Sequence, residues 1–437
     1  MKAGFISLGC NKNLVDTEKT IALFKAHGYE IVNNPETAEV IIINTCGFIE
    51  SAKKEAINTI LEMSEYKKHN CKYLIVMGCL VERYKKELEK SIPEVDLYIK
   101  YSEYSTLWEQ IQKLLFNKKE NVDFEKFTDR VITTGENYAY IKIADGCSNC
   151  CTFCAIPKIR GIQKSRTIES IVQEAQKLAN EGYEEIILTA QDTTRYGQDI
   201  YGVPKLIQLL KEIEKIDKIK WIRILYSYPE TITDELIKIV MESSKICHYF
   251  DIPIQHISDS VLKRMNRKSN GESIRKLIQK LRKEIPDVII RTTVMVGFPG
   301  ETQEDFEELY NFLKDAKFDK LGAFMYSREE GTGAEKMTNQ IHQATKKSRY
   351  NKIMKLQQQI SRENLEDKIG TIQKVRIDGI TKNQKYYVGR TYMDVPEIDG
   401  IVYIKNTKQL NLGDWVDCKI IEVKNYDLMG EMNFENK

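Results

Sequence analysis

Apolar runs of strand length alternate with amphipathic helical patterns along the first third of the chain. Such alternation predicts a parallel sheet covered by helices, because each helix returns the chain to the same edge of the sheet. We therefore expect residues 1–117 to form a parallel α/β domain. The predicted strands, each with the helix that follows it, are Ala3–Leu8 and Leu14–His27, Val40–Asn44 and Ser51–Tyr66, and Tyr73–Met77 and Leu80–Lys90.

A polar stretch at residues 118–132 is predicted to be a linker, and a second alternating series then fills residues 133–368. Its six β/α units exceed what an open nucleotide-binding fold needs and indicate a partial TIM-like (β/α)6 barrel. The long amphipathic helix at Ile341–Lys368 is predicted to be a solvated connection. The six expected strands are Tyr138–Ala144, Glu185–Thr189, Trp221–Leu225, Tyr249–Ile254, Val288–Val296 and Leu321–Met325. The expected helices between them include Thr167–Asn180, Asp234–Ser243, Ser273–Glu284 and Gln303–Asp315.

The pattern changes after Gly370 to short alternating strands separated by turn residues. This indicates a small antiparallel barrel of OB-like type at residues 369–437. The chain is thus predicted to be a multidomain α/β protein with a parallel-sheet domain, a partial barrel and a β-barrel. The strands expected in the last domain are Thr371–Asp378, Lys385–Thr391, Gly400–Ile404 and Trp415–Val423.

The composition is that of an ordinary globular protein, with 437 residues, 42% hydrophobic and 30% charged residues, and a net charge of +2. No apolar run approaches the roughly 20 residues that span a membrane. The first residues lack a cleavage signature, so we expect a cytoplasmic protein without a membrane partner. In that compartment the ten cysteines indicate metal ligation rather than disulfides. The small net charge gives no case for direct binding of nucleic acid.

The most informative segment is the loop Asp145-Gly-Cys-Ser-Asn-Cys-Cys-Thr-Phe-Cys154. Three of its cysteines, Cys147, Cys151 and Cys154, stand in C-x3-C-x2-C register, and we call them the loop cysteines. Three such thiolates can bind three irons of a cubane cluster and leave the fourth iron open to a substrate. Four thiolates on eight consecutive residues suit tetrahedral zinc poorly, and a pure electron carrier would need Cys150 as a fourth ligand. We interpret Cys150 as a spectator thiol.

Three more cysteines, Cys10, Cys46 and Cys79, each follow a predicted strand of the first domain and stand beside a glycine. The carboxyl ends of parallel strands lie along one edge of a sheet, so these strand-end cysteines are expected to meet in space. A single free cysteine is more often a small buried hydrophobe, but three in the same topological position indicate a second three-cysteine cluster. The other cysteines lack such a context and are interpreted as structural: Cys71, Cys247 and Cys418.

Three modules in this order, with these two sets of cysteines, resemble the methylthiotransferases of the radical S-adenosylmethionine (SAM) superfamily. The resemblance covers essentially the whole chain, with a cysteine-bearing N-terminal domain, a radical core and a C-terminal TRAM barrel. Two loop positions, Arg328 and Gly333, depart from the proline that relatives often have there. Further matching segments are Ala155–Gly161, Leu188–Gly197, Gly297–Thr302 and Tyr326–Thr332.

The resemblance implies two 4Fe–4S clusters and SAM as cofactors, and a reduced flavodoxin or ferredoxin as electron donor. It implies that SAM is cleaved at the loop cysteines to a radical that removes a substrate hydrogen, and that the strand-end cluster presents sulfur. No protein base can remove such a hydrogen as a proton, so cofactors carry the chemistry and no catalytic acid or base side chain is expected. The implied SAM contacts are Phe153, Gln191 and Gly297, for which ordinary packing is the alternative.

Two branches of this family differ in substrate. One modifies an adenosine in transfer RNA, and the other modifies the β-carbon of an aspartate in the small-subunit ribosomal protein S-twelve. The segment Asp251-Ile-Pro-Ile-Gln-His-Ile-Ser258 resembles the ribosomal branch through His256, although a packed histidine would look the same. Residues 389–400 also resemble that branch and place three acids in one loop. We expect His256 and these acids to contact substrate: Asp394, Glu397 and Asp399.

The charge of the last domain bears on the same question. Residues 371–437 hold ten Lys/Arg and ten Asp/Glu. A neutral barrel with an acidic loop suits a basic protein better than a phosphate backbone, unless the acids only keep the loop solvated. Together with this charge balance, the resemblance implies an aspartate methylthiotransferase acting on ribosomal protein S-twelve. The alternatives are a transfer RNA adenosine methylthiotransferase and, from another class, a non-catalytic iron–sulfur carrier.

Overall fold

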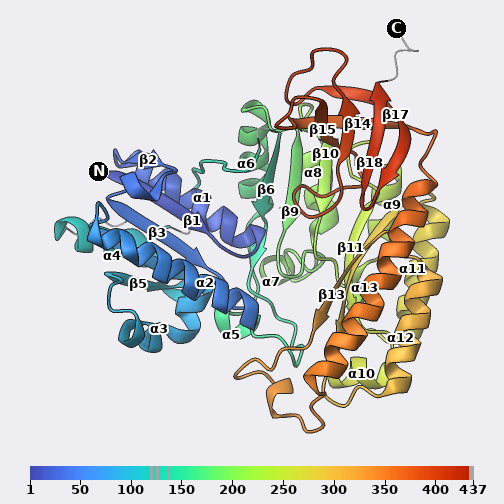
Figure 1. The fold of residues 1–437 in the computed structure, drawn as a ribbon, viewed down its shortest axis with the longest axis horizontal. Helices are drawn as coiled ribbons and strands as arrows, with labels where there is room; N and C mark the ends of the chain where they lie inside the picture. The colour runs from blue at the N-terminus through green and yellow to red at the C-terminus, as the bar shows by residue number, and fades with distance from the viewer. Residues whose placement is uncertain (119–121, 125–126, 136, 433–437) are drawn as a thin grey trace.

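The computed structural model describes residues 1–118, 122–124, 127–135 and 137–432, which form three domains (Figure 1). The N-terminal domain lies beside the central domain, and the C-terminal barrel lies at one end of the central strands. Parts of two predicted domains and of the linker lie outside the described residues, namely 119–121, 125–126, 136 and 433–437. The domain boundaries at 117, 132 and 368 stay predictions. Among the residues described, none of the helices has the length and apolar character needed to cross a membrane.

The N-terminal domain is a five-stranded parallel sheet in the order β2-β1-β3-β4-β5. The parallel α/β class is confirmed, and two short strands, β2 and β5, extend the three predicted ones. The order reverses between β1 and β3, which creates a switch point of the kind where doubly wound sheets bind ligands. Apolar residues cover both faces of the sheet. The main elements are β1 (Lys2–Ser7), α1 (Asn11–Ala26), β2 (Glu30–Val32), β3 (Val40–Thr45), α2 (Glu50–Ser64), β4 (Tyr73–Gly78), α3 (Cys79–Ser91), β5 (Leu97–Lys100) and α4 (Leu107–Phe116).

The barrel of the central domain has six strands in chain order, β6-β9-β10 and then β11-β12-β13, so the partial barrel is confirmed. The described part of the domain also holds the two-stranded sheet of β7 (Ala144–Asp145) and β8 (Lys164–Ser165). The two halves of the barrel meet where Cys247 N–H donates to Ile222 O at 2.9 Å. We call the edge formed by the carboxyl ends of the six barrel strands the mouth, and the opposite edge the base. The strands are β6 (Tyr138–Lys142), β9 (Glu185–Thr189), β10 (Trp221–Ile224), β11 (Tyr249–Gln255), β12 (Ile289–Val296) and β13 (Lys320–Met325).

Helices cover the outside of these strands, and the last of them corrects one expectation. The segment predicted to be a solvated connection packs against β13 and α12, with Ile353 and Ile360 buried in the barrel core. Its apolar stripe covers the edge strand of the barrel, so the interpretation as a solvated connection is wrong. The helices are α5 (Ile156–Arg160), α6 (Ile168–Asn180), α7 (Gln198–Tyr201), α8 (Leu206–Glu214), α9 (Asp234–Glu242), α10 (Asp259–Arg264), α11 (Gly271–Glu284), α12 (Gln303–Ala316) and α13 (Gln343–Glu366).

The C-terminal domain is a closed barrel in the order β14-β15-β16-β18-β17, so the OB-like type is confirmed with a fifth strand. Neighbouring strands are antiparallel except β16 and β18, which pair in parallel. A closed ring of five strands cannot alternate direction throughout, and this is why one parallel pair is required. The strands are β14 (Ile372–Ile380), β15 (Tyr386–Arg390), β16 (Val402–Lys405), β17 (Trp415–Lys424) and β18 (Asp427–Met432).

This barrel packs on the base of the central domain. One hydrophobic cluster joins Tyr138 and Tyr249, at the amino ends of central strands, to Val375 and other barrel residues. The rings of Trp221 and Trp415 meet edge to face with centroids 4.6 Å apart, a favoured aromatic geometry. The C-terminal barrel therefore does not cover the mouth, which the N-terminal domain contacts instead.

Candidate functional site

The loop cysteines lie at the mouth, after β6 and the short strand β7 (Ala144–Asp145). Cys147 and Cys151 are buried and Cys154 is half-buried, whereas Cys150 is exposed. The carbonyl of Cys150 accepts a hydrogen bond from Asn266 Nδ2 at 2.8 Å on the outer side of the loop. The register in which Cys150 is the spectator stays a prediction.

Two buried contacts hold this loop in place. Asn149 Nδ2 donates to Asp192 Oδ2 at 2.7 Å and ties the loop to the chain that follows β9. On the other side, Arg267 Nη1 lies 3.8 Å from Cys151 Sγ, and the same guanidinium lies 4.3 Å from the ring centroid of Tyr228. A buried cation therefore faces one of the three thiols.

The strand-end cysteines occupy equivalent positions on neighbouring strands. Cys10 lies between β1 and α1, Cys46 follows β3, and Cys79 begins α3 directly after β4. The turns approach closely, since a Cβ on Gly9 would lie 3.0 Å from Cys46 Sγ. Gly9 also has a φ of +91°, a conformation that favours glycine. The topology thus brings this edge together as the sequence predicted.

Burial raises the pKa of cysteine thiols at both sites, whereas nearby positive charges lower it. Burial raises the pKa of Cys79 to about 12 and that of Cys154 to about 12. Burial also raises the pKa of Cys10, but the charges of Lys12 and Arg160 outweigh it and leave this pKa below its ordinary value. The thiolate is the form that binds metal, so nearby cations favour ligation by the strand-end cysteines.

One strand-end cysteine contacts α5, the short helix that follows the loop cysteines. Cys79 packs with Ala155 and Ile159 in one small buried cluster. Arg160, the last residue of α5, donates to Asn13 Oδ1, and Cys79 Sγ lies 3.8 Å from the same oxygen. A strand-end thiol therefore faces the helix that leaves the loop cysteines.

Arg160 also belongs to a buried ion network between the two domains. Its Nη1 donates to Asp145 Oδ2 at 2.7 Å, and its Nη2 lies 3.3 Å from Asp16 Oδ2. Lys142 Nζ donates to the same two carboxylates. Asp145 also accepts from Gln191 Nε2 at 2.9 Å. The network holds the N-terminal domain against the mouth and starts two residues before the first loop cysteine.

The donor atoms at the mouth fit a cluster with a polar ligand. In the part of the chain that the structure describes, no three His, Cys, Asp or Glu side chains converge on a single metal ion. A cubane cluster does not need ligands that converge on one ion, because each of its three thiolates binds a different iron. Native proteins rarely leave buried polar atoms unpaired; among the described residues such atoms occur at the base, as at Arg376, and at the mouth, where a bound polar ligand would satisfy them. Those at the mouth are Gln191 Oε1, Ser227 Oγ, Glu230 Oε2, Arg267 Nε and Ser269 Oγ.

The three predicted SAM contacts all lie at the mouth. Phe153 is half-buried and packs against an apolar cluster that contains Phe298. Gln191 follows β9 and keeps one side-chain oxygen without a partner. Gly297 follows β12 with a φ of +72°, and its N–H donates to Glu301 Oε2 at 2.6 Å. Contact of these residues with SAM stays a prediction.

His256 lies at the mouth but is completely buried. The Ser258 N–H donates to its Nδ1 at 3.0 Å, so the neutral ring carries its hydrogen on Nε2, 4.0 Å from Glu301 Oε2. Burial lowers the pKa of His256 to about 3. Glu301 in turn holds the turn at Gly297. His256 is therefore a packed residue behind that turn, and the structure supplies no surface at which it would touch a protein substrate.

The three acids of residues 389–400 lie at the base, on the edge opposite the cysteines. Lys320, the first residue of β13, donates to Asp394 Oδ1 at 2.7 Å. Tyr249, the first residue of β11, donates to Asp399 Oδ2 at 2.7 Å. Glu397 is exposed on the same loop. The loop thus docks the barrel onto the base, and the open acidic surface expected from the sequence is not present at Asp394 and Asp399, because their charges have partners within the chain.

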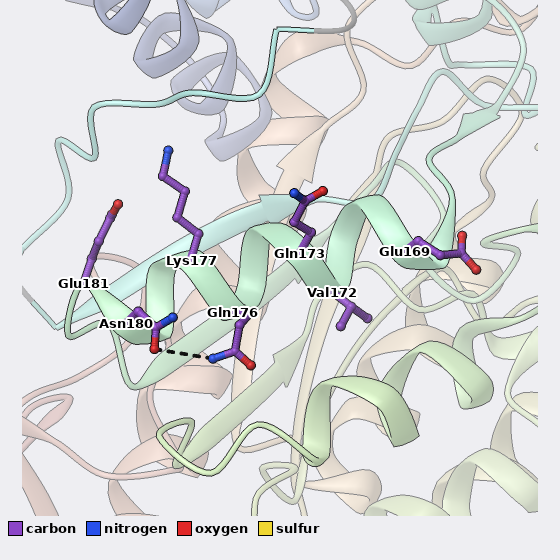
Figure 2. Close-up of a pocket in the computed structure, with 7 residues that line it drawn as sticks. All are labelled: Glu169, Val172, Gln173, Gln176, Lys177, Asn180 and Glu181. Carbon is purple, nitrogen blue, oxygen red and sulfur yellow. Dashed lines mark hydrogen bonds between the residues drawn. The ribbon is translucent and has the colours of Figure 1, made fainter.

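A separate hollow of about 750 Å³ runs along the outer face of α6. Figure 2 shows its side chains pointing in different directions from one helix, with Gln176 donating to Asn180 at 3.5 Å. The residues that line it are polar or charged apart from Val172 and include no cysteine. This hollow is a solvated helix face and does not compete with the mouth as the candidate site.

Family models match three parts of the chain, in the order of the three domains. They are the uncharacterized protein family UPF0004 at residues 2–100, the radical SAM superfamily at residues 141–313 and the TRAM domain at residues 369–432. Together with the cysteine sites at the mouth, they define the class as a radical SAM enzyme with a TRAM domain. Membership in this superfamily implies a 4Fe–4S cluster and SAM.

Individual relatives narrow the class. The chain is 62% identical over 441 residues to the ribosomal protein uS12 methylthiotransferase RimO of Alkaliphilus oremlandii (strain OhILAs), and the match covers all of both chains. It is 47% identical to the protein of the same name from Acetivibrio thermocellus, covering 99% of this chain and 98% of that one. The chain belongs to the RimO family of methylthiotransferases.

Solved structures agree with the fold. The radical SAM methyltransferase TsrM from Kitasatospora setae matches with a TM-score of 0.57 over 76% of each chain. Its sequence identity to this chain is 13%, so this likeness concerns the fold alone.

Sequence reasoning missed the network that joins the two sites. Asp145 and Arg160 stood in segments that carried the family resemblance, but no role was assigned to them. Asn13 and Asp16 were not singled out at all. Their spacing held a weak signal, because positions 13 and 16 share one face of the helix that begins after Cys10.

Proposed function

We propose that this chain adds a methylthio group to the β-carbon of an aspartate in ribosomal protein S-twelve. The names of its relatives and their identity of up to 62% over the full length support this assignment. The observation that carries it is that Cys79, of the strand-end set, packs against Ala155 and Ile159, which closely follow the loop cysteines in the chain. An enzyme that only generates a radical needs one such set, whereas sulfur insertion also needs a site that presents sulfur.

The loop cysteines would hold one 4Fe–4S cluster and the strand-end cysteines a second one. When bound, these groups and SAM supply the radical and the sulfur, which no side chain can supply. Residues of the chain orient the bound groups. Arg267 places a cation beside Cys151, and Glu301 fixes the turn at Gly297. A reduced flavodoxin or ferredoxin would provide the electron.

The N-terminal domain covers part of the mouth and limits the access of water. Lys12 Nζ lies 3.5 Å from Ala190 O and 3.6 Å from the ring centroid of Tyr226. Thr189 Oγ1 donates to Asn11 Oδ1 at 3.1 Å. These contacts bring the first turn of α1 onto the carboxyl ends of β9 and β10. A radical formed there would be shielded from solvent on this side.

The test is the intact mass of ribosomal protein S-twelve from cells that lack this gene, with and without a plasmid copy. We expect the protein from the deletion strain to lack one methylthio group and the plasmid to restore it. An unchanged mass, with methylthiolated adenosine lost from transfer RNA, would transfer the assignment to the RNA-modifying branch. Purified reduced protein that releases no deoxyadenosine from SAM would instead indicate an iron–sulfur carrier.

A further inference from the structure

Arg160 reaches from the central domain into the site of the strand-end cysteines. Its side chain is 1% exposed. It donates to Asn13 Oδ1, and Cys79 Sγ lies 3.8 Å from that oxygen. The helix that carries Arg160 also packs Ile159 against Cys79. A guanidinium keeps its charge in proteins, so a permanent cation from one domain lies beside the thiols of the other.

Two carboxylates and one further cation surround the Arg160 guanidinium. Arg160 Nη1 binds Asp145, and Lys142 binds both carboxylates of the network, Asp145 and Asp16. The two cations and the two carboxylates of this network balance in charge. Of the two cations, Arg160 is the one that contacts Asn13 Oδ1, the oxygen that Cys79 Sγ also contacts.

We propose that Arg160 is a positioning residue that supplies a fixed positive charge to the strand-end cluster and raises its reduction potential. This inference rests on the proposed function, in which Cys10, Cys46 and Cys79 hold a cluster. Reduction adds one negative charge to a buried site, and a nearby cation stabilises the more negative state. Hydrogen bonds and net charge around the sulfurs are established determinants of cluster potential. The site is thus completed only when the two domains are docked.

The experiment uses the full-length chain with Cys147→Ala, Cys151→Ala and Cys154→Ala, which leaves the strand-end cluster as the source of signal. Its potential is titrated by electron paramagnetic resonance with and without Arg160→Gln. We expect Arg160→Gln to reduce the ratio of reduced to oxidised cluster about tenfold at a given potential, which is about 59 mV for one electron. Arg160→Lys keeps the charge and should restore most of the potential.

Arg130→Gln is the matched control. Arg130 is an equally buried arginine between the domains, 5% exposed, and it pairs with Glu18 at 2.9 Å and Glu174 at 2.6 Å. Its loss should weaken docking to a similar degree and leave the potential unchanged. Equal potentials in Arg160→Gln, Arg130→Gln and the parent, at equal iron content, would overturn the inference.

A second variant decides the matter if Arg160→Gln does not retain iron. Asp145→Asn is isosteric and removes a negative charge that binds Arg160, so it should shift the potential upward. An unshifted potential in Asp145→Asn contradicts the inference. A parent protein that binds no cluster at all would contradict the proposed function itself, and the two failures are therefore distinguishable.

Discussion

The mouth and the base of the central barrel both bury charged side chains, yet they use them differently. At the base, Glu185 pairs with Arg223 at 3.0 Å and with Arg390 at 2.9 Å. At the mouth, the buried guanidinium of Arg267 instead faces a thiol, with Nη1 3.8 Å from Cys151 Sγ. Charges pair across a domain interface at both edges, but at the mouth a buried cation also lies beside one of the loop cysteines.

This difference explains why the acidic loop misled the sequence argument. Asp394 and Asp399 looked like an open surface for a basic substrate, but they bind residues at the amino ends of central strands. In β/α barrels the carboxyl ends carry chemistry and the amino ends carry stability. Substitutions at the two edges should therefore separate activity from stability, and each prediction below tests that separation.

The largest expected effect is at the mouth. Cys151→Ala removes one of three ligands and should reduce deoxyadenosine release from SAM to the level of protein without a cluster. The loop is anchored independently through Asn149 and Asp192, so the unfolding temperature of the iron-free protein should not change. Deoxyadenosine is measured by chromatography and unfolding by circular dichroism. Retained SAM cleavage would contradict the assigned register.

Cys79→Ala should abolish the methylthiolated product and leave deoxyadenosine release in place, because the loop cysteines remain intact. The measurement is product mass and deoxyadenosine in the same reaction. If Cys79→Ala lost deoxyadenosine release as well as the product, the two cysteine sets would act as a single site rather than as two.

At the base, Arg390→Met should destabilise the protein without changing the chemistry. The substitution removes the cation that Glu185 and Asp378 share and leaves the buried Glu185 with Arg223 alone. Breaking a buried ion pair costs about 3–5 kcal/mol. Thermal unfolding measures the loss, and SAM cleavage per folded molecule at low temperature should remain within about twofold. A loss of SAM cleavage without a loss of stability would contradict the claim that the base determines stability rather than activity.

His256 connects stability to pH at the mouth. Its folded pKa of about 3 lies below an unfolded value of about 6.5. Between these values the unfolded chain binds a proton that the native chain does not, so the free energy of unfolding falls as pH decreases. From pH 7 to pH 5 this loss is about 2 kcal/mol. His256→Gln should remove that share of the pH dependence in urea unfolding of the iron-free protein, and an identical slope would show that His256 does not cause it.

The smallest effect is expected for Cys150→Ala. Its side chain is exposed on the outer side of the loop, and its carbonyl bond to Asn266 does not depend on the thiol. Iron content and deoxyadenosine release should both match the unsubstituted protein. Loss of the cluster in Cys150→Ala, with retention in Cys151→Ala, would reverse their roles.

The sequence by itself determined the elements and the two sets of cysteines. Periodicity separated the strands from the helices, and the loop cysteines were visible because their ligands are adjacent in the chain. The strand-end cysteines could be grouped because parallel strands end at one edge, a rule that needs no coordinates. The three-residue strand β2 carried too few residues to show a period, and β18 was missed because Asp427, Gly430 and Glu431 interrupt its apolar pattern.

Only the tertiary structure decided which side chains meet across the domain interfaces. Asn13 and Arg160 are separated by 147 positions, and Tyr249 and Asp399 by 150, yet each pair is hydrogen-bonded. The chain pattern records which face of an element is buried, but not which partner covers it. For that reason the sequence could name the thiols of both sites, while the cation between them and the true role of the acidic loop emerged from the docking of the three domains.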